Sequence, residues 1–295
     1  MPAPDFLCIG AQKAGTTWLQ ENLSRHPDIW LPPPKELHYF DHPHPGLAAR
    51  LFNRKKNHLR KARHHLAEKL VERLRDPGRE QAYDELAWAY RYCLGRRSDA
   101  WYATLFPTLP GRLRGEVCPG YARIPEPRVA DVARLMPQGR IVYLLRNPVE
   151  RAWSSLSMHF RKGGDQLIDD VSEADVLRRF ESPKTRGHAE YARNLASWEA
   201  HFGPDRLFVG FFDDLAGDPR AFLASVLGFL GARADESVLP PDVGERRNAG
   251  RAEVMPESVA RALARVCLPE ARAMEARFHN AHTRRWLEMT EAWAA

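Results

Sequence analysis

The stretch DFLCIGAQKAGTTWLQENL, residues 5–23, decides the fold. It opens with a short apolar run that stops at Gly10, which is typical of a buried parallel strand. Apolar side chains then recur at helical spacing from Trp18 to Leu23. Between them lie small residues, whose backbone N–H groups can converge on an anion beside the positive end of the helix. The order strand, glycine-rich loop and helix therefore predicts a phosphate-binding loop.

This loop differs from the nucleotide triphosphatase signature GxxxxGK[ST]. Gly10 and Gly15 have the spacing of that signature, but Lys13 lies inside the loop instead of following the second glycine. Thr16 and Thr17 are expected to cap the helix and to donate hydroxyl hydrogen bonds to phosphate oxygens. A plain strand-to-helix turn without a ligand is the alternative interpretation of the same residues.

A second anion-binding segment follows the apolar run RIVYLL, residues 140–145, which is the clearest buried strand in the sequence. The run ends in Arg146, where a magnesium-dependent enzyme usually carries an acidic residue, so no metal site is expected. Pro148 begins a helix that carries Ser154. A guanidinium and a hydroxyl at the end of a parallel strand suit one phosphate group. Pairing of Arg146 with a carboxylate stays open as the alternative.

Strands and helices alternate along the rest of the chain. Further apolar runs predict strands at residues 113–117 and 207–212. Helices are expected at residues 129–136, 148–160, 191–198, 221–230, 256–279 and 282–293. This alternation predicts an α/β fold, with a parallel sheet flanked by helices, in a single domain over residues 1–295. Residues 44–104 are predicted to form a helical insertion.

The charge of the chain suits an anionic ligand. The 295 residues include 44 Lys and Arg against 38 Asp and Glu, and the isoelectric point is about 9.2. Residues 50–79 hold 11 basic and 3 acidic side chains. The remainder is therefore close to neutral, which argues against general nucleic-acid binding. The basic stretch either contacts an acidic acceptor or forms a solvated face of an amphipathic helix.

The cysteine pattern and the hydropathy favour a cytoplasmic protein. The four cysteines are widely spaced, with no CxxC pair and no metal-ligand spacing. Reduced thiols fit a cytoplasmic setting. No run of about 20 apolar residues occurs, so we expect no membrane span. The sequence gives no indication of an oligomeric state.

The two anion-binding segments resemble those of sulfotransferases that use 3'-phosphoadenosine 5'-phosphosulfate (PAPS). GAQKAGTTW, residues 10–18, looks like the 5'-phosphosulfate loop, and IVYLLRNPVERAWSS, residues 141–155, looks like the 3'-phosphate segment. The resemblance implies a P-loop-like sheet, PAPS as co-substrate, 3'-phosphoadenosine 5'-phosphate (PAP) as product, and no metal. The residues implied to bind the nucleotide are Gln12, Lys13, Ala14, Gly15, Thr16, Thr17, Trp18, Arg146, Ser154, Tyr191, Arg246, Arg247, Asn248 and Gly250.

The segment KELHYFD, residues 35–41, is similar to the branch that includes heparan sulfate sulfotransferases. RVADVARLMPQGR, GHAEYARNLASW and FVGFFDDLAGDP also look like this branch. The resemblance implies that Glu36 is the catalytic base. His38 is the competing candidate, because on a strand both side chains would face the same side. The branch often carries a lysine where this chain has Val117.

The sequence thus predicts direct in-line transfer of a sulfuryl group from PAPS to a hydroxyl or amine of a glycan or small natural product. Lys13 is expected to neutralise charge on the departing nucleotide, because a sulfuryl group carries less charge than a terminal phosphoryl group and needs no Mg²⁺. Eukaryotic glycan enzymes of the family are usually membrane-anchored. Because no membrane anchor is expected in this chain, a bacterial origin is expected. A P-loop kinase or nucleotide hydrolase, and a non-catalytic nucleotide-binding module, are the alternatives.

Overall fold

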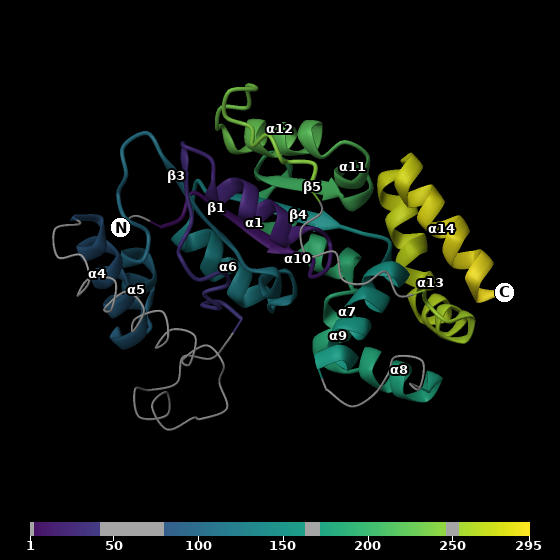
Figure 1. Ribbon diagram of the computed structural model, residues 1–295. Coiled ribbons are helices and arrows are strands. Elements are labelled where there is room, and N and C mark those ends of the chain that lie inside the picture. Colours follow the sequence, from purple (N-terminus) through teal and green to yellow (C-terminus); the bar gives the residue numbers. More distant parts are fainter. Residues whose placement is uncertain (1–2, 42–79, 163–171, 246–253) are drawn as a thin grey trace.

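A five-stranded parallel sheet forms the centre of the protein (Figure 1). The structure is a computed structural model that describes residues 3–41, 80–162, 172–245 and 254–295. In spatial order the strands are β2 (Ile29–Trp30), β3 (Leu113–Val117), β1 (Phe6–Gly10), β4 (Arg140–Leu145) and β5 (Leu207–Phe211). All neighbouring strands run parallel. The predicted α/β fold, a P-loop-like parallel sheet flanked by helices, is confirmed.

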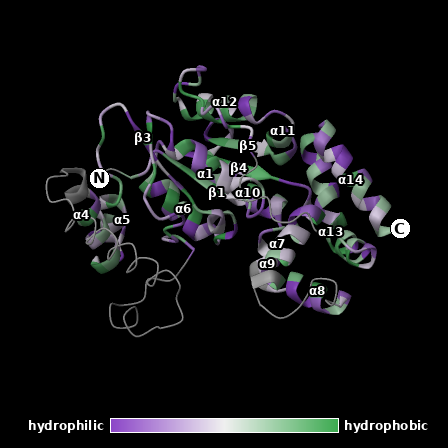
Figure 2. Ribbon diagram, in the orientation of Figure 1, coloured by the Kyte–Doolittle hydropathy of each residue, from purple (hydrophilic) through white to green (hydrophobic). Residues whose placement is uncertain are grey.

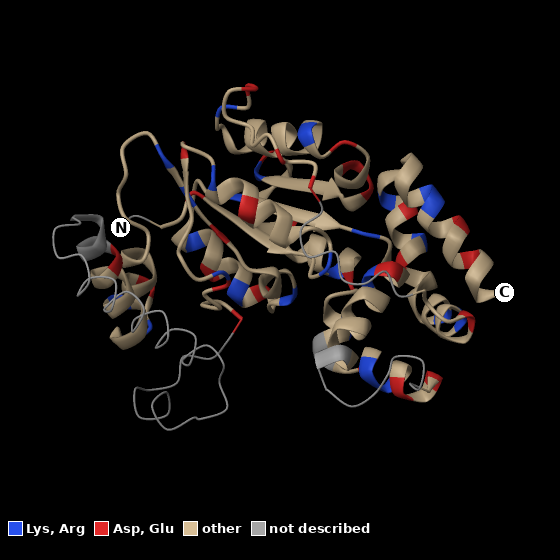
Figure 3. Ribbon diagram, viewed as in Figure 1, with Lys and Arg blue, Asp and Glu red and all other residues tan. Residues whose placement is uncertain are grey.

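Helices surround this sheet, with α4 and α5 beyond one end and α13 and α14 beyond the other (Figure 1). The described helices are α1 (Thr16–Ser24), α4 (Glu80–Leu94), α5 (Asp99–Thr104), α6 (Glu126–Leu135), α7 (Pro148–Lys162), α8 (Glu173–Phe180), α9 (Pro183–Gly187), α10 (Tyr191–Phe202), α11 (Phe212–Gly217), α12 (Pro219–Leu230), α13 (Glu257–Phe278), α14 (Ala281–Ala294) and the short 3₁₀-helices η1 (Pro119–Arg123) and η3 (Pro204–Arg206). Most Lys, Arg, Asp and Glu positions lie on helices and connecting loops (Figure 3).

The central strands are apolar on both faces, as expected for strands covered by helices on both sides. Every residue of β1 is buried, and β4 is buried from Ile141 to Leu145. The hydropathy colours show the same apolar centre (Figure 2). A second apolar cluster, which includes Val149, Leu156 and Leu263, packs α7 against α8 and α13. This cluster fixes α7, the helix that begins directly after Arg146 and Asn147.

The connections between the strands place a switch point of the strand order beside β1. After β1 the chain crosses to β2, returns through β3, and then enters β4 on the other side of β1. The strand order therefore reverses between β1 and β4, where Gly10 lies opposite Tyr143. Ligands of open α/β sheets bind at such a switch point, beyond the carboxyl ends of the strands. The two predicted anion-binding segments leave the sheet at this point.

Most predicted elements are confirmed, and three differences are informative. β2, α8, α9 and α11 were not expected, and Phe212 begins α11 instead of ending β5. Residues 35–41 form a loop, not a strand. Of the predicted insertion at 44–104, the described part contains α4 and α5, while residues 42–79, with most of the basic stretch, lie outside the described residues. The single-domain boundaries stay a prediction. No helix in the described ranges has the length and apolar character to cross a membrane.

Candidate functional site

The glycine-rich loop between β1 and α1 depends on a backbone conformation that only glycine adopts easily. Gly15 has φ 90° and occupies the N-cap of α1. A Cβ atom at this position would lie 2.4 Å from Cδ2 of Leu215. Because Gly15 is the cap, Thr16 and Thr17 lie in the first helical turn, and the prediction that they cap the helix is wrong. Thr16 is buried there, and the hydroxyl of Thr17 accepts a hydrogen bond from the Lys35 ammonium at 2.7 Å.

The N-terminus of α1 has the character of an anion-binding site. The first hydrogen bond of the helix runs from the Leu19 N–H to the Gly15 carbonyl at 3.0 Å. The preceding N–H groups of the first turn therefore have no acceptor within the helix. The turn carries no acidic side chain. Ala14 is buried, while Gln12 is partly exposed. The small buried side chain lets the backbone approach a ligand closely.

Arg146 brings the second predicted segment against this loop. Its guanidinium donates a hydrogen bond to the Lys13 carbonyl at 3.3 Å and lies 4.6 Å from the ring of Phe212. It also pairs with the Glu150 carboxylate at 3.2 Å, so the alternative of a carboxylate partner is seen as well. Both partners are partly solvated, with 23% and 33% of their side chains exposed. Such a pair is weak and can be replaced by a phosphate.

The remaining predicted nucleotide ligands differ in where they lie. Tyr191 is buried and donates its hydroxyl hydrogen bond to the Arg146 carbonyl at 3.0 Å, so it supports the backbone of that residue. Ser154 is partly exposed on α7. Trp18 is buried, and its indole N–H donates to the Val243 carbonyl at 2.8 Å, so its side chain is committed to the core. The predicted ligands outside the described residues are Arg246, Arg247, Asn248 and Gly250.

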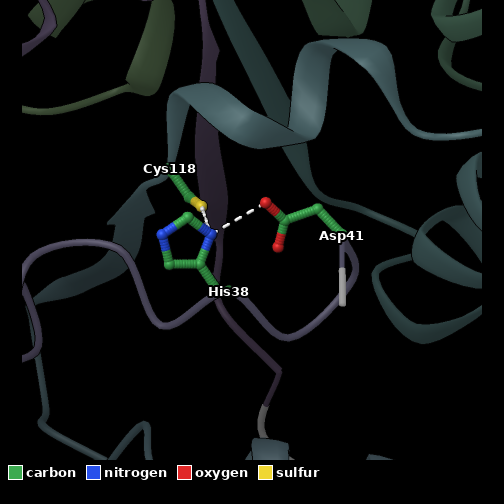
Figure 4. Close-up of side chains that lie close together, drawn as sticks. All are labelled: His38, Asp41 and Cys118. Carbon is green, nitrogen blue, oxygen red and sulfur yellow. Dashed lines mark hydrogen bonds and ion pairs between the residues drawn. The ribbon is translucent and has the colours of Figure 1, made fainter. Parts of the chain in front are cut away.

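The loop at residues 35–41 brings Glu36 and His38 together through a left-handed backbone and not through the alternation of a strand. Both residues have positive φ, 65° and 54°. Oε2 of Glu36 lies 3.2 Å from Nε2 of His38. On the other side of the ring, Nδ1 lies 2.8 Å from Oδ2 of Asp41 and 3.7 Å from Sγ of Cys118 (Figure 4). The imidazole is therefore held between two carboxylates.

These contacts set the charges of the loop. Burial alone would lower the pKa of His38, but the hydrogen bonds and charges of Asp41 and Glu36 outweigh it and raise the pKa to about 9. Burial would likewise raise the pKa of Glu36, but the hydrogen bond and charge of His38 lower it overall. At neutral pH the imidazole is thus a cation and Glu36 is a carboxylate.

The buried carboxylate of Glu116 holds this loop in place. Glu116 Oε1 accepts a hydrogen bond from the Leu37 N–H at 2.8 Å, and Oε2 accepts one from the Tyr102 hydroxyl at 2.7 Å. The Tyr121 hydroxyl donates to Glu116 at 3.0 Å and accepts from the Tyr39 N–H at 2.8 Å. Burial raises the pKa of Glu116 to about 7, although these hydrogen bonds oppose the shift. The contacts fix the backbone on both sides of His38.

Sequence analysis missed three residues of this site: Lys35, Asp41 and Glu116. The ammonium of Lys35 donates a hydrogen bond to Oγ1 of Thr17 at 2.7 Å and thereby connects the loop to α1. Lys35 and Asp41 both stand in KELHYFD, so their closeness to Glu36 in the sequence was an available signal. Glu116 lies within the predicted strand 113–117, and only the structure reveals its contacts. Val117, where the branch often has lysine, is buried.

Three side chains of the site resemble a metal-binding group. Potential ligand atoms of His38, Asp41 and Cys118 lie within 4.8 Å of one another (Figure 4). Burial raises the pKa of the Cys118 thiol well above its usual range. Metal binding requires the thiolate and a free imidazole nitrogen, whereas Nδ1 of His38 is in hydrogen-bond contact with Asp41. The arrangement fits a hydrogen-bonded imidazolium better than a metal centre.

The site thus contains an anion-binding loop, an arginine directly after the adjacent strand β4, and the loop at residues 35–41, here called the acid–base loop. These features can be compared with known families. The sequence model of the sulfotransferase family matches residues 4–236. This chain belongs to the sulfotransferase family. The matched range includes β1 to β5 and every described residue of the sites above. No curated protein sequence matches the chain.

Solved sulfotransferase structures share the fold. The sulfotransferase from Alicyclobacillus acidocaldarius has a TM-score of 0.60 at 23% identity, and the likeness covers 100% of both chains. The sulfotransferase domain of the Synechococcus PCC 7002 olefin synthase has a TM-score of 0.54 at 18% identity, covering 100% of this chain and 95% of that one. Mouse sulfotransferase SULT7A1, solved with PAP, has a TM-score of 0.52 at 15% identity, covering 100% and 91%. At these identities the likeness shows the fold alone.

Proposed function

We propose that this sulfotransferase transfers a sulfuryl group from PAPS to a hydroxyl or amine acceptor. The observation that carries the proposal is the contact between the two anion-binding segments, in which the Arg146 guanidinium hydrogen-bonds the Lys13 carbonyl at 3.3 Å. The loop and the first turn of α1 bind the 5'-phosphosulfate. Arg146 and Ser154 bind the 3'-phosphate. A ligand with anionic groups at both positions fits this pair of sites better than a nucleoside triphosphate, whose phosphates form one chain.

The acid–base loop supplies the proton chemistry. As the acceptor oxygen or nitrogen bonds to sulfur, the bond between sulfur and the bridging oxygen breaks, and its electron pair stays on the phosphate of PAP. Glu36 takes the acceptor proton, because it is a carboxylate at neutral pH. His38, with a pKa of about 9, is already protonated and orients Glu36 instead. Lys13 neutralises charge on the departing oxygen.

The acceptor is proposed to be a glycan or a small natural product. The support is the likeness of residues 35–41 to the branch that includes heparan sulfate sulfotransferases, together with the Glu36 carboxylate beside the anion-binding loop. A direct in-line displacement needs no covalent attachment to the protein, and the site offers a base without a nucleophilic thiolate, since burial keeps Cys118 protonated.

Calorimetric titration with PAP, combined with transfer of labelled sulfate from PAPS to a panel of acceptors and a cell extract, tests the proposal. We expect Glu36→Gln to bind PAP normally and to lose turnover. Lys13→Ala should lose roughly 10²–10³ in rate. Glu257→Gln, whose side chain is 88% exposed on α13, is the matched control and should behave as wild type. Absence of PAP binding, or turnover of ATP with Mg²⁺ and none of PAPS, would refute the proposal.

A further inference from the structure

Lys35 places a cation between the two halves of the site. Its Nζ lies 2.7 Å from Oγ1 of Thr17, in the first turn of α1, and 3.9 Å from Oε1 of Glu36. Its side chain is only 27% exposed. The ammonium therefore stands where the anion-binding loop meets the proposed base.

The ammonium of Lys35 has more N–H donors than these two contacts use. It has three N–H donors, and its one hydrogen bond in the described part of the chain goes to the neutral hydroxyl of Thr17. Glu36 is beyond hydrogen-bond distance. Burial lowers the pKa of Lys35, although the Glu36 charge opposes the shift. Donors of a buried cation that lack strong acceptors are suited to an anionic ligand.

The position of the Lys35 ammonium indicates which part of the proposed co-substrate it would contact. In an in-line transfer the acceptor atom, the sulfur and the bridging oxygen lie on one axis from Glu36 to the anion-binding loop. A cation between Glu36 and Thr17 is beside the middle of that axis, close to the non-bridging oxygens of the sulfuryl group. Lys13 differs, because its Nζ lies 3.7 Å from Sδ of Met158 on α7, toward the segment that begins with Arg146.

We infer that Lys35 is a further catalytic residue, which contacts the non-bridging oxygens of the transferring sulfuryl group and so distinguishes PAPS from PAP. The inference rests on the proposed function. In the transfer no proton leaves Lys35. It holds the sulfuryl oxygens while the bond from sulfur to the acceptor forms and the bond to the bridging oxygen breaks. Lys13 acts on the leaving oxygen, so the two lysines have separate roles.

Binding of PAPS and PAP without an acceptor tests this division. We expect Lys35→Met to weaken PAPS binding about tenfold or more and to leave PAP binding within about twofold of wild type. Transfer of the sulfuryl group to water, measured as sulfate released from bound PAPS, should fall by roughly 10²–10³. Lys35→Arg should restore part of the PAPS affinity. Lys13→Met should weaken both ligands.

Two controls separate Lys35 from its neighbours. Glu36→Gln should keep the difference between PAPS and PAP affinities. If Lys35 acted only by balancing the charge of Glu36, this substitution would instead change that difference. If Lys35→Met weakens PAPS and PAP equally, or changes only the melting temperature, then Lys35 is a structural support for Thr17. That outcome overturns this inference and leaves the proposed function intact. If the wild-type protein binds neither ligand, both are overturned.

Discussion

Glu116→Gln removes a buried charge from beneath the acid–base loop and leaves the shape of the side chain almost unchanged. The carboxylate is fully buried and accepts hydrogen bonds from Leu37, Tyr102 and Tyr121. A glutamine carbonyl still accepts the hydrogen bond from the Leu37 N–H. The amide NH₂ cannot accept the hydrogen bond that Oε2 receives from the Tyr102 hydroxyl, so the pH dependence of the stability difference is what isolates the free-energy cost of the negative charge.

The magnitude follows from the pKa of the folded state. Burial raises the pKa of Glu116 from 4.5 to about 7, against the opposing hydrogen bonds. Between these values the folded protein binds more protons at this group than the unfolded chain, so its free energy of unfolding falls as the pH rises. A difference of about 2.5 units, at roughly 1.4 kcal/mol per unit, corresponds to about 3–4 kcal/mol. The destabilisation is complete above pH 7 and absent well below pH 4.5.

Urea unfolding at pH 5 and pH 8, followed by tryptophan fluorescence, measures this effect. From pH 5 to pH 8 the stability of Glu116→Gln should improve relative to wild type by about 2–3 kcal/mol. The exposed Glu257→Gln control should show no such change. A stability difference between Glu116→Gln and wild type that stays constant over this pH range would contradict the reasoning, because it would place the ionisation of Glu116 at its ordinary pKa.

Other substitutions test the remaining contacts. Asp41→Asn removes one of the two carboxylates beside His38 and should lower the pKa of the imidazole by about 1–3 units, measured by NMR titration of the ring protons; an unchanged value near 9 contradicts the pairing. Gly15→Ala should cost about 2–5 kcal/mol in urea unfolding, from positive φ and overlap with a leucine of α11, whereas Gly217→Ala, where a Cβ meets no atom within 4 Å, should cost far less. Arg146→Gln should weaken PAP binding roughly 10–100-fold in calorimetry with little change in stability, and equal affinity would remove Arg146 from the site.

The fold was predictable because its central elements carry their signals locally. β4 is a run of apolar and β-branched residues, and the segment after β1 contains the glycines that the loop requires. β2 escaped prediction because two residues, Ile29 and Trp30, are too few to show a periodic pattern. The predicted strand 207–212 extends one residue too far, because an apolar run does not mark where the next helix begins.

The acid–base loop was less predictable because its shape comes from distant residues. The backbone is left-handed at Glu36 and His38, where no glycine in the sequence indicates this conformation. Its support comes from Glu116 and Tyr121 on the β3 side, and from Arg97, which donates to the His38 carbonyl at 3.2 Å. Such contacts cross 59 or more positions of sequence. The sequence predicted that the side chains of Glu36 and His38 face the same side, but it did so from strand alternation, whereas the structure brings them together in a loop with positive φ.

The charges of the site explain why one protein can hold a highly anionic nucleotide and still accept a neutral hydroxyl or amine. On the acceptor side, the cations of Lys35 and His38 are matched by the carboxylates of Glu36 and Asp41, so this side has little net charge. On the nucleotide side, the first turn of α1 adds partial positive charge and carries no acidic residue. Negative charge is therefore attracted more strongly to the nucleotide side than to the acceptor side. A carboxylate base beside a bound sulfate would otherwise repel it, and the proposed contact of Lys35 with the sulfuryl oxygens removes that repulsion at the point where the two sides meet.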